Sequence, residues 1–280
     1  EGGSQILLRT TAQPFVQIDL VPAPRYSEAD DMAMAYGGHS PDFSSHFFSD
    51  HDSLTSATSQ APEPPDPGIA GSDLYEWRGG QLSLVNVLPG NVTVAVGATF
   101  ASKSPDVHPV SANGARVFWQ AGGVVYVRED AALTRRIEDP GSFVAASESG
   151  DMVLLSDGCL YSLATEGCID LTEGGGGFLG LAAASDDLSR LYFVDTAKLT
   201  GSGTNERGAE ATAGKPNLYF YEDTSGTRFV ATLAITDGNG GPADLNDWGA
   251  AAGTQTNAIG QRTAEASPDG HYLAFVSTER

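Results

Sequence analysis

Basic residues are scarce in this sequence. Lysine and arginine together number 15 against 36 aspartate and glutamate residues, which gives a formal net charge of −21 at pH 7. A surface of that sign repels the phosphates of nucleic acids and the headgroups of anionic membranes, so we expect neither as a partner. Solubility explains the acidic surface most simply, and charge alone does not separate cation binding or adaptation to high salt from it.

Long apolar runs are also missing. No stretch approaches the roughly 20 apolar residues of a membrane-spanning helix, so no membrane insertion is predicted. Charged residues make up only 18% of the 280 residues, while 34 glycines and 15 prolines interrupt the chain often. Such frequent breakers favour many short strands joined by turns. No secretory signal is recognisable, and because the first residue is Glu1 rather than methionine, an upstream targeting segment is compatible with the sequence.

Cysteine occurs only twice, as Cys159 and Cys168 in "GCLYSLATEGCIDL". The two cysteines flank a hairpin-like segment, and residues facing each other across two strands can lie within disulfide reach. We therefore predict a cross-strand disulfide, with two free thiols in a reducing compartment as the alternative. One cysteine pair without neighbouring histidines makes a poor zinc site.

A short motif occurs five times. Each copy begins with a serine, has Asp, Asn or Ser two residues later, and then has Gly in three copies but Phe43 and Leu188 in the other two. The polar side chain can cap a tight turn, and Gly adopts a positive φ without strain. We expect the turns at Phe43 and Leu188 to be built differently. The copies are "SPDFSSHFF", "SANGARVFW", "SESGDMVLL", "SDDLSRLYF" and "SPDGHYLAF", starting at Ser40, Ser111, Ser147, Ser185 and Ser267.

Each copy ends in three mostly apolar residues, typical of a strand packed on both faces. A small-residue segment precedes the serine, as in "FVAAS". A second motif with a Tyr follows four copies, at "DLYEW", "VVYVR", "CLYSL" and "NLYFY", and a weaker strand comes after it. The motifs thus predict four antiparallel strands in each unit. A four-stranded antiparallel unit of this kind is the blade of a β-propeller, an all-β fold. A β-sandwich also has short strands but does not require this in-phase pair of motifs.

The segment "ASPDGHYLAFVS", its sister copies and the "NLYFYE" strand resemble the repeats of TolB-type, WD-repeat-like β-propellers. The resemblance covers roughly residues 40–280 and implies a single β-propeller domain over residues 1–280. Four whole blades are expected, with half blades at the ends: "QILLRT" and "FVQIDL" at one end, residues 264–280 at the other. The halves either close a five-bladed ring or belong to a larger propeller of which this chain is a fragment.

Four long connections are predicted, at residues 56–72, 89–110, 201–216 and 235–265. They follow the second or the fourth strand of a unit, and in an antiparallel blade both connections leave from the same end. We therefore expect all four on one face of the propeller, which is where binding residues often gather. Alternatively, the loops at this face became longer only because no selection acted against their length.

One of these loops, "TDGNGGPADLNDW", suggests a calcium site. Calcium binds several oxygen ligands on a backbone that can wrap around it, although the closing Glu and flanking helices of the helix-loop-helix calcium site are missing here. An ordinary solvated loop is the alternative, and no other cofactor is expected. The candidate ligands are Asp237, Asn239, Asp244, Asn246 and Asp247.

Other candidate chemistry is weak. The stretch "HSPDFSSHFFSDHD" holds several histidines and aspartates, but His46 occupies the strand position of Leu191 and Leu273 in sister copies, so we expect a hydrogen-bonded core residue rather than a metal ligand. No Ser elbow of the G-x-S-x-G kind is present, and we assign no catalytic residue.

The sequence therefore favours a non-enzymatic binding or scaffold module of an exported bacterial protein. The partner would be a protein, a peptide or a glycan, bound through the loop-rich face. The extracellular or periplasmic location is inferred from the cysteine pair, the few lysines and the family resemblance. The alternative is an accessory propeller of a larger hydrolase whose catalytic part lies outside this chain.

Overall fold

In the computed structural model of the protein, the residues described are 7–8, 16–17, 35–50, 54–55, 73–91, 95, 97–102, 105–173, 175, 177–233 and 264–275. Apart from a single 3-10 turn, η1 (Pro105–Val107), these residues form only strands, turns and irregular segments. No helix among them is long and apolar enough to cross a membrane. The chain divides into two compact units, residues 1–138 and 139–280, which are taken in turn.

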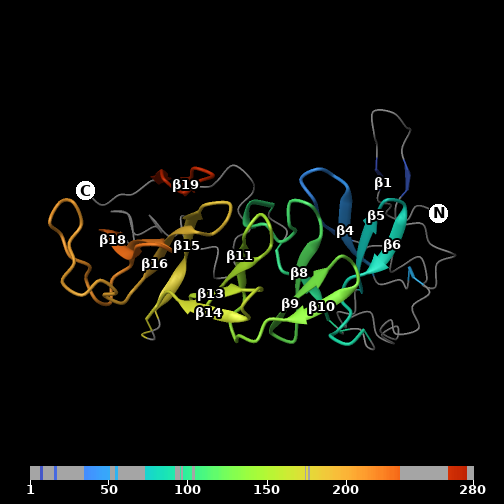
Figure 1. Ribbon diagram of the computed structural model, residues 1–280, viewed down its shortest axis with the longest axis horizontal. Helices are drawn as coiled ribbons and strands as arrows, with labels where there is room; N and C mark the ends of the chain where they lie inside the picture. The colour runs from blue at the N-terminus through green and yellow to red at the C-terminus, as the bar shows by residue number, and fades with distance from the viewer. Residues whose placement is uncertain are drawn as a thin grey trace, which may run out of the picture. The chain divides into compact units, whose positions relative to one another are not determined.

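The first unit holds two four-stranded antiparallel sheets and one strand pair (Figure 1). The pair consists of β1 (Leu7–Leu8) and β2 (Val16–Gln17). The first sheet runs in the order β3 (Ala35–His39), β4 (Ser45–Asp50), β5 (Asp73–Arg78) and β6 (Gln81–Leu84). The second runs in the order β7 (Thr99–Phe100), β8 (Arg116–Ala121), β9 (Val124–Glu129) and β10 (Leu133–Arg136).

The second unit repeats this plan. One sheet runs β11 (Phe143–Ala146), β12 (Met152–Leu155), β13 (Cys159–Ser162) and β14 (Gly167–Asp170). The next runs β15 (Phe178–Ala184), β16 (Arg190–Asp195), β17 (Asn217–Glu222) and β18 (Gly226–Thr232). A strand pair follows, β19 (Ala264–Ala266) and β20 (Leu273–Phe275). In all four sheets the strands are neighbours in chain order, so the predicted all-β architecture of four-stranded antiparallel sheets is confirmed.

The repeated serine motif closes the turn between the first and second strands. In the first copy the Ser40 hydroxyl donates to Asp42 Oδ1 at 2.6 Å and accepts the Ser45 backbone N–H at 3.0 Å. Asp42 Oδ1 also accepts the Ser44 N–H at 3.0 Å. The side chains thus satisfy backbone groups that the turn leaves without ladder partners. The serine–acceptor pairs of the other copies are Ser111 with Asn113, Ser147 with Ser149, Ser185 with Asp187, and Ser267 with Asp269.

The prediction that two of these turns differ is wrong. Phe43 and Leu188 have φ values of 58° and 57°, close to the 66° of Gly114 in the same position. The backbone N–H groups of Phe43 and Leu188 also make the turn's hydrogen bond, to Ser40 and Ser185 at 2.8 and 3.0 Å. A left-handed conformation costs a non-glycine residue about 1–2 kcal/mol, and the hydrogen bonds from the serine and aspartate side chains offset that cost.

The second strands form the core of the sheets, as their apolar triplets predict. Phe47, Phe118, Leu154 and Phe193 are fully buried. The fifth copy differs, because Phe275 on β20 is 36% exposed. The inner strand predicted directly before Ser111 is wrong. The first strand of this sheet, β7, lies inside the predicted connection 89–110, and next to the serine only an isolated bridge pairs Val110 with Val117.

Backbone hydrogen bonds link successive turns in the second unit. The Glu148 N–H donates to the Asp186 carbonyl at 2.6 Å, and the Asp186 N–H donates to the Pro268 carbonyl at 2.9 Å. Arg190 and Tyr192 also reach the last turn, where they donate to the carbonyls of Asp269 and Gly270 at 3.0 and 3.1 Å. The sheet β15–β18 is therefore held on both sides by the turns of its neighbours.

Candidate functional site

The predicted calcium loop lies outside the described residues. The structure therefore does not test the calcium site, which stays a prediction. The candidate ligands outside the described residues are Asp237, Asn239, Asp244, Asn246 and Asp247. The same holds for His51 and Asp52 in the histidine-rich stretch and for the predicted connection 56–72.

His46 is a core residue. It is 4% exposed, and a hydrogen bond with the Phe43 backbone satisfies one ring nitrogen, while Nε2 has no hydrogen-bond partner. Burial lowers the pKa of this imidazole. The ring centroid of His39 lies 6.4 Å away. Within the described part of the chain, no third metal-binding side chain joins these two histidines.

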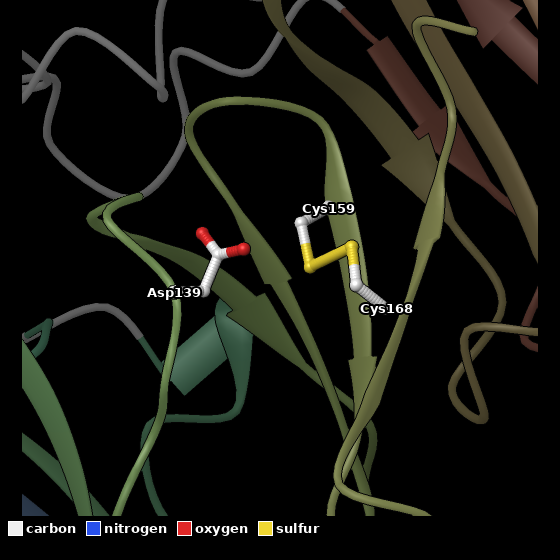
Figure 2. A group of neighbouring side chains, drawn as sticks. All are labelled: Asp139, Cys159 and Cys168. Atoms are coloured by element: carbon white, nitrogen blue, oxygen red, sulfur yellow. A yellow bond between two sulfur atoms is a disulfide. The ribbon is translucent and has the colours of Figure 1, made fainter. Parts of the chain in front are cut away.

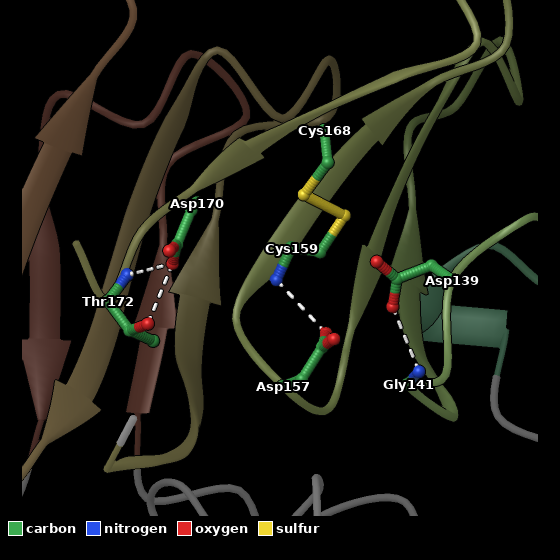
Figure 3. The surroundings of a disulfide bond; sticks show 7 residues. All are labelled: Asp139, Gly141, Asp157, Cys159, Cys168, Asp170 and Thr172. Atoms are coloured by element: carbon green, nitrogen blue, oxygen red, sulfur yellow. Dashed lines mark hydrogen bonds between the residues drawn. A yellow bond between two sulfur atoms is a disulfide. The ribbon is translucent and has the colours of Figure 1, made fainter. Parts of the chain in front are cut away.

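Cys159 and Cys168 form a disulfide between β13 and β14, with their Cα atoms 5.5 Å apart (Figure 3). The two residues are diagonal neighbours rather than directly opposite, because Cys159 pairs with Asp170 and Cys168 pairs with Tyr161. All four side chains lie on the same face of the hairpin, since facing residues share a face and side chains alternate along a strand. Cys159 is buried and Cys168 is exposed.

A carboxyl group lies beside the disulfide. The Asp139 carboxylate and the two sulfur atoms all lie within 4.8 Å of one another (Figure 2). Asp139 lies in the segment that enters β11, where its Oδ1 accepts the Gly141 N–H at 2.9 Å. Within the described residues, this is the only group of three or more His, Cys, Asp or Glu side chains close enough to share a metal ion.

A second carboxyl group, that of Asp157, comes from the turn between β12 and β13. Its Oδ1 accepts the Cys159 N–H at 3.2 Å, which ties the turn to the disulfide (Figure 3). Burial, then a hydrogen bond with Asp157, raises the pKa of Asp139. Gly141 allows this approach, because a Cβ at that position would lie 2.6 Å from Asp157 Oδ1 and 2.7 Å from Leu155 Cβ.

In the oxidised state this arrangement is structural. Closing a loop of about 10 residues removes chain entropy from the unfolded state worth roughly 3 kcal/mol. The predicted cysteine pairing fits this geometry, but sequence reasoning missed Asp139 and Asp157. Their local signals are the turn sequences "DPG" at 139–141 and "DG" at 157–158, which bring an Asp side chain back toward its own strand.

A second candidate region is the connection between β16 and β17, residues 196–216. The Tyr219 hydroxyl accepts the Leu199 N–H at 3.3 Å and donates to the Ala197 carbonyl at 2.6 Å. At its other end, the buried Asn217 donates to the carbonyls of Thr212 and Lys215 at 2.9 and 2.8 Å. Side chains of β17 therefore fasten both ends of the insertion.

The middle of this insertion is also ordered. Lys198 and Glu210 form an ion pair at 2.5 Å, and Thr204 and Glu210 form an isolated β-bridge. The side chain of Asn205 donates to the Val230 carbonyl at 2.9 Å. Residues 206–210 remain exposed between these anchors. The predicted insertion 201–216 is thus a surface connection that holds polar groups in fixed positions.

Both regions belong to the same end of their sheets. The connection 196–216 joins the second strand to the third, and Asp157 lies in the corresponding three-residue turn of sheet β11–β14, residues 156–158. Asp139 precedes the first strand of that sheet, which starts at this end. We call this end of a sheet the insertion end.

Comparison with known proteins adds no assignment. No protein-family model matches the chain, and no curated protein matches it significantly. The resemblance to TolB-type propellers therefore stays a prediction from the repeated motif.

Proposed function

We propose that the four-stranded sheets are blades of a β-propeller, and that the protein is a non-enzymatic binding module of an exported bacterial protein. The repeated turn supports the propeller, because every sheet carries the same serine-capped turn between its first and second strands. The disulfide supports an exported location, since disulfides persist mainly in oxidising compartments.

Ring closure is part of this proposal. The pair β1–β2 and the pair β19–β20 supply four strands, which is what one further blade requires. An experimental structure that shows the "QILLRT" and "FVQIDL" strands paired with β19–β20 supports a five-bladed ring. A structure in which these strands pair elsewhere supports a propeller with more blades.

The ordered insertion 196–216 carries the binding proposal. A loop that is anchored by buried side chains loses little conformational entropy when a partner binds, so its exposed polar groups are prepared for recognition. Asn217 and Tyr219 provide those anchors, while Glu206 and Arg207 stay exposed between them. The partner we propose is a protein, peptide or glycan that contacts the insertion end.

Binding is tested on peptide and glycan arrays, with hits measured by calorimetry. A variant in which Gly-Gly replaces residues 196–216 copies the two-residue turn Gly122–Gly123 of sheet β7–β10. We expect this variant to bind at least about tenfold more weakly, a loss of about 1.4 kcal/mol. The control is Thr224→Ala, in the turn between β17 and β18 at the opposite end of the same sheet. A hit that both variants bind as well as the parent protein contradicts the proposal.

A further inference from the structure

Beside the disulfide lies a carboxylate that the disulfide itself does not require and that could bind a metal ion. A carboxylate oxygen of Asp139 lies within 4.8 Å of both sulfur atoms (Figure 2). The groups that act on this carboxyl are its buried surroundings, Asp157 and the Gly141 N–H, and none of them is a cation. The hydrogen bond between the two carboxyls requires one of them to be protonated, so the pair carries one negative charge, and the groups that act on Asp139 supply no cation to balance it.

We propose that this cluster is a redox-gated zinc site: after reduction of the disulfide, Cys159, Cys168 and Asp139 bind one Zn²⁺ ion. The cysteine pair alone is a poor zinc site, and the structure adds the Asp139 carboxylate as a third ligand. Two thiolates and one carboxylate are ligands that zinc accepts in its tetrahedral sites, and a water molecule fills the fourth position. Asp139 and Asp157 are within hydrogen-bonding reach of each other. When Asp139 is ionised on zinc, Asp157 keeps the shared proton and donates it to an Asp139 oxygen, as outer partners of metal ligands commonly do. The hard cations Ca²⁺ and Mg²⁺ prefer oxygen ligands and are not expected here.

The backbone geometry suits this ligand set. Tetrahedral zinc with Zn–S bonds of about 2.3 Å places its two sulfur atoms roughly 3.8 Å apart. The two Cα atoms are 5.5 Å apart, and the hairpin pairs Tyr161 with Cys168 and Cys159 with Asp170 independently of the disulfide. Rotation of the two cysteine side chains can therefore open the sulfur pair without moving the strands. Asp139 is held near them by its turn with Gly141.

The redox step is a two-electron reduction. With a phosphine and water, the S–S bond breaks, the two sulfurs each gain a proton, and the phosphine becomes a phosphine oxide. Zinc binding then replaces the two thiol protons, which pass to solvent. In the oxidised protein the sulfurs are bonded to each other and are not thiolate ligands, so the same residues do not form the site. The exposed side chain of Cys168 gives the reductant access.

Cobalt reports on the site directly. The whole chain is reduced with a phosphine, desalted without oxygen, and titrated with Co²⁺ and then Zn²⁺. We expect one equivalent of Co²⁺ to give a sulfur-to-cobalt charge-transfer band and tetrahedral d–d bands, which Zn²⁺ removes. The oxidised protein and the Cys168→Ser variant should show neither. Asp157→Ala, which removes the hydrogen-bond donor to Asp139, should weaken binding by about 10–100-fold, and Asp139→Asn at least as much.

The matched control is Asp170→Asn, a neighbouring carboxyl that faces Cys159 across the hairpin but lies outside the cluster. This variant should bind cobalt like the parent protein. Equal binding by Asp139→Asn overturns the proposal, because the cysteine pair then binds metal without the carboxyl. Equal binding by the oxidised protein also overturns it.

Reduction can also lower the stability of the chain, so melting is measured in parallel. Zn²⁺ should raise the melting temperature of the reduced protein, because a ligand that binds only the folded state stabilises it. Mg²⁺ at the same concentration should leave it unchanged. If the reduced chain is unfolded and Zn²⁺ does not restore its fold, the proposal is wrong.

Discussion

The sheets β3–β6 and β15–β18 hold the chain that follows their second strand through the same hydrogen bond. In the first sheet the Leu54 N–H donates to the Tyr75 hydroxyl at 3.2 Å, and in the other the Leu199 N–H donates to the Tyr219 hydroxyl at 3.3 Å. Both leucines are buried. This shared contact explains why "DHDSLT" and "DTAKLT" recur at 50–55 and 195–200: the leucine spacing places a backbone donor over the tyrosine of the third strand.

The two sheets differ in what their equivalent side chains meet. Leu188 is 2% exposed, whereas Phe43, with the same backbone conformation, is 55% exposed. The strand position that holds the buried Leu191 in one sheet holds His46 in the other. Local sequence therefore determines the turn, while burial depends on the neighbours of each sheet. In the second unit these neighbours are the turns at Glu148 and Pro268.

The largest expected effect concerns the two turn residues. Leu188→Ala removes a buried side chain and should lower the free energy of unfolding by about 2–5 kcal/mol. Phe43→Ala should lower it by only about 0.5–1.5 kcal/mol, because the exposed ring loses its stacking on His39, whose ring centroid lies 3.9 Å away. Phe43→Gly should be about 1 kcal/mol more stable than Phe43→Ala, because glycine has no penalty at a positive φ. Urea unfolding of the three variants measures these values, and equal losses for both alanine variants would contradict the comparison.

The next effect concerns Leu191 and His46, which occupy the same position on the second strands of the two sheets. Leu191→His buries an imidazole in an apolar position and should cost about 2–3 kcal/mol. His46→Leu removes a buried nitrogen, Nε2, that lacks a partner, and should stabilise the protein by about 1 kcal/mol.

The same pair of variants has a pH test. Burial lowers the pKa of His46, so the unfolded chain binds a proton first as the pH falls below about 6.5. The parent protein should therefore lose stability below that pH, and the advantage of His46→Leu should be larger at pH 5 than at pH 8. Thermal melting at both pH values decides this. An advantage that does not change with pH means that His46 titrates alike in the folded and unfolded states.

A smaller effect is expected at the tyrosine that anchors the insertion. Tyr219→Phe leaves the N–H of Leu199 and the carbonyl of Ala197 without their partner and should cost about 1–2 kcal/mol. Cleavage by a protease should accelerate within residues 196–216 in particular. The control is Tyr221→Phe on the same strand, whose hydroxyl has no hydrogen-bond partner within the described part of the chain. Equal cleavage of both variants would show that the hydroxyl does not anchor the insertion.

The sequence predicted the regular parts of the fold well, because they depend on short-range patterns. The serine turns, the apolar second strands and the tyrosine strands all follow from residues within one unit. It failed where distant residues meet. Asp139 and Asp157 approach the disulfide because two turns converge at the insertion end. Strand β7 ends at Phe100, ten residues before Val110, the residue that directly precedes the repeated serine. Neither arrangement has a periodic signal.

The smallest effect compares the turn aspartates as the pH is lowered. Hydrogen bonds from the Ser40 hydroxyl and the Ser44 backbone lower the pKa of Asp42 from 3.8 to about 2. A lowered pKa means that the folded chain releases this proton more readily than the unfolded chain. The stabilisation is therefore complete above pH 4 and is lost as the pH falls toward about 2.

Asp42→Asn removes this titration while it keeps the side-chain acceptor, as Asn113 does in the sister turn. The variant should therefore melt with a flatter pH dependence than the parent protein between pH 4 and pH 2. Because Asp42 is exposed to solvent, the difference should be small and should shrink further in salt, which screens exposed charges. A carboxyl titration by NMR that places Asp42 at an ordinary pKa would show that the serine hydrogen bond is not maintained in solution. The turn would then owe its shape to the backbone hydrogen bond between Phe43 and Ser40 rather than to the charged side chain.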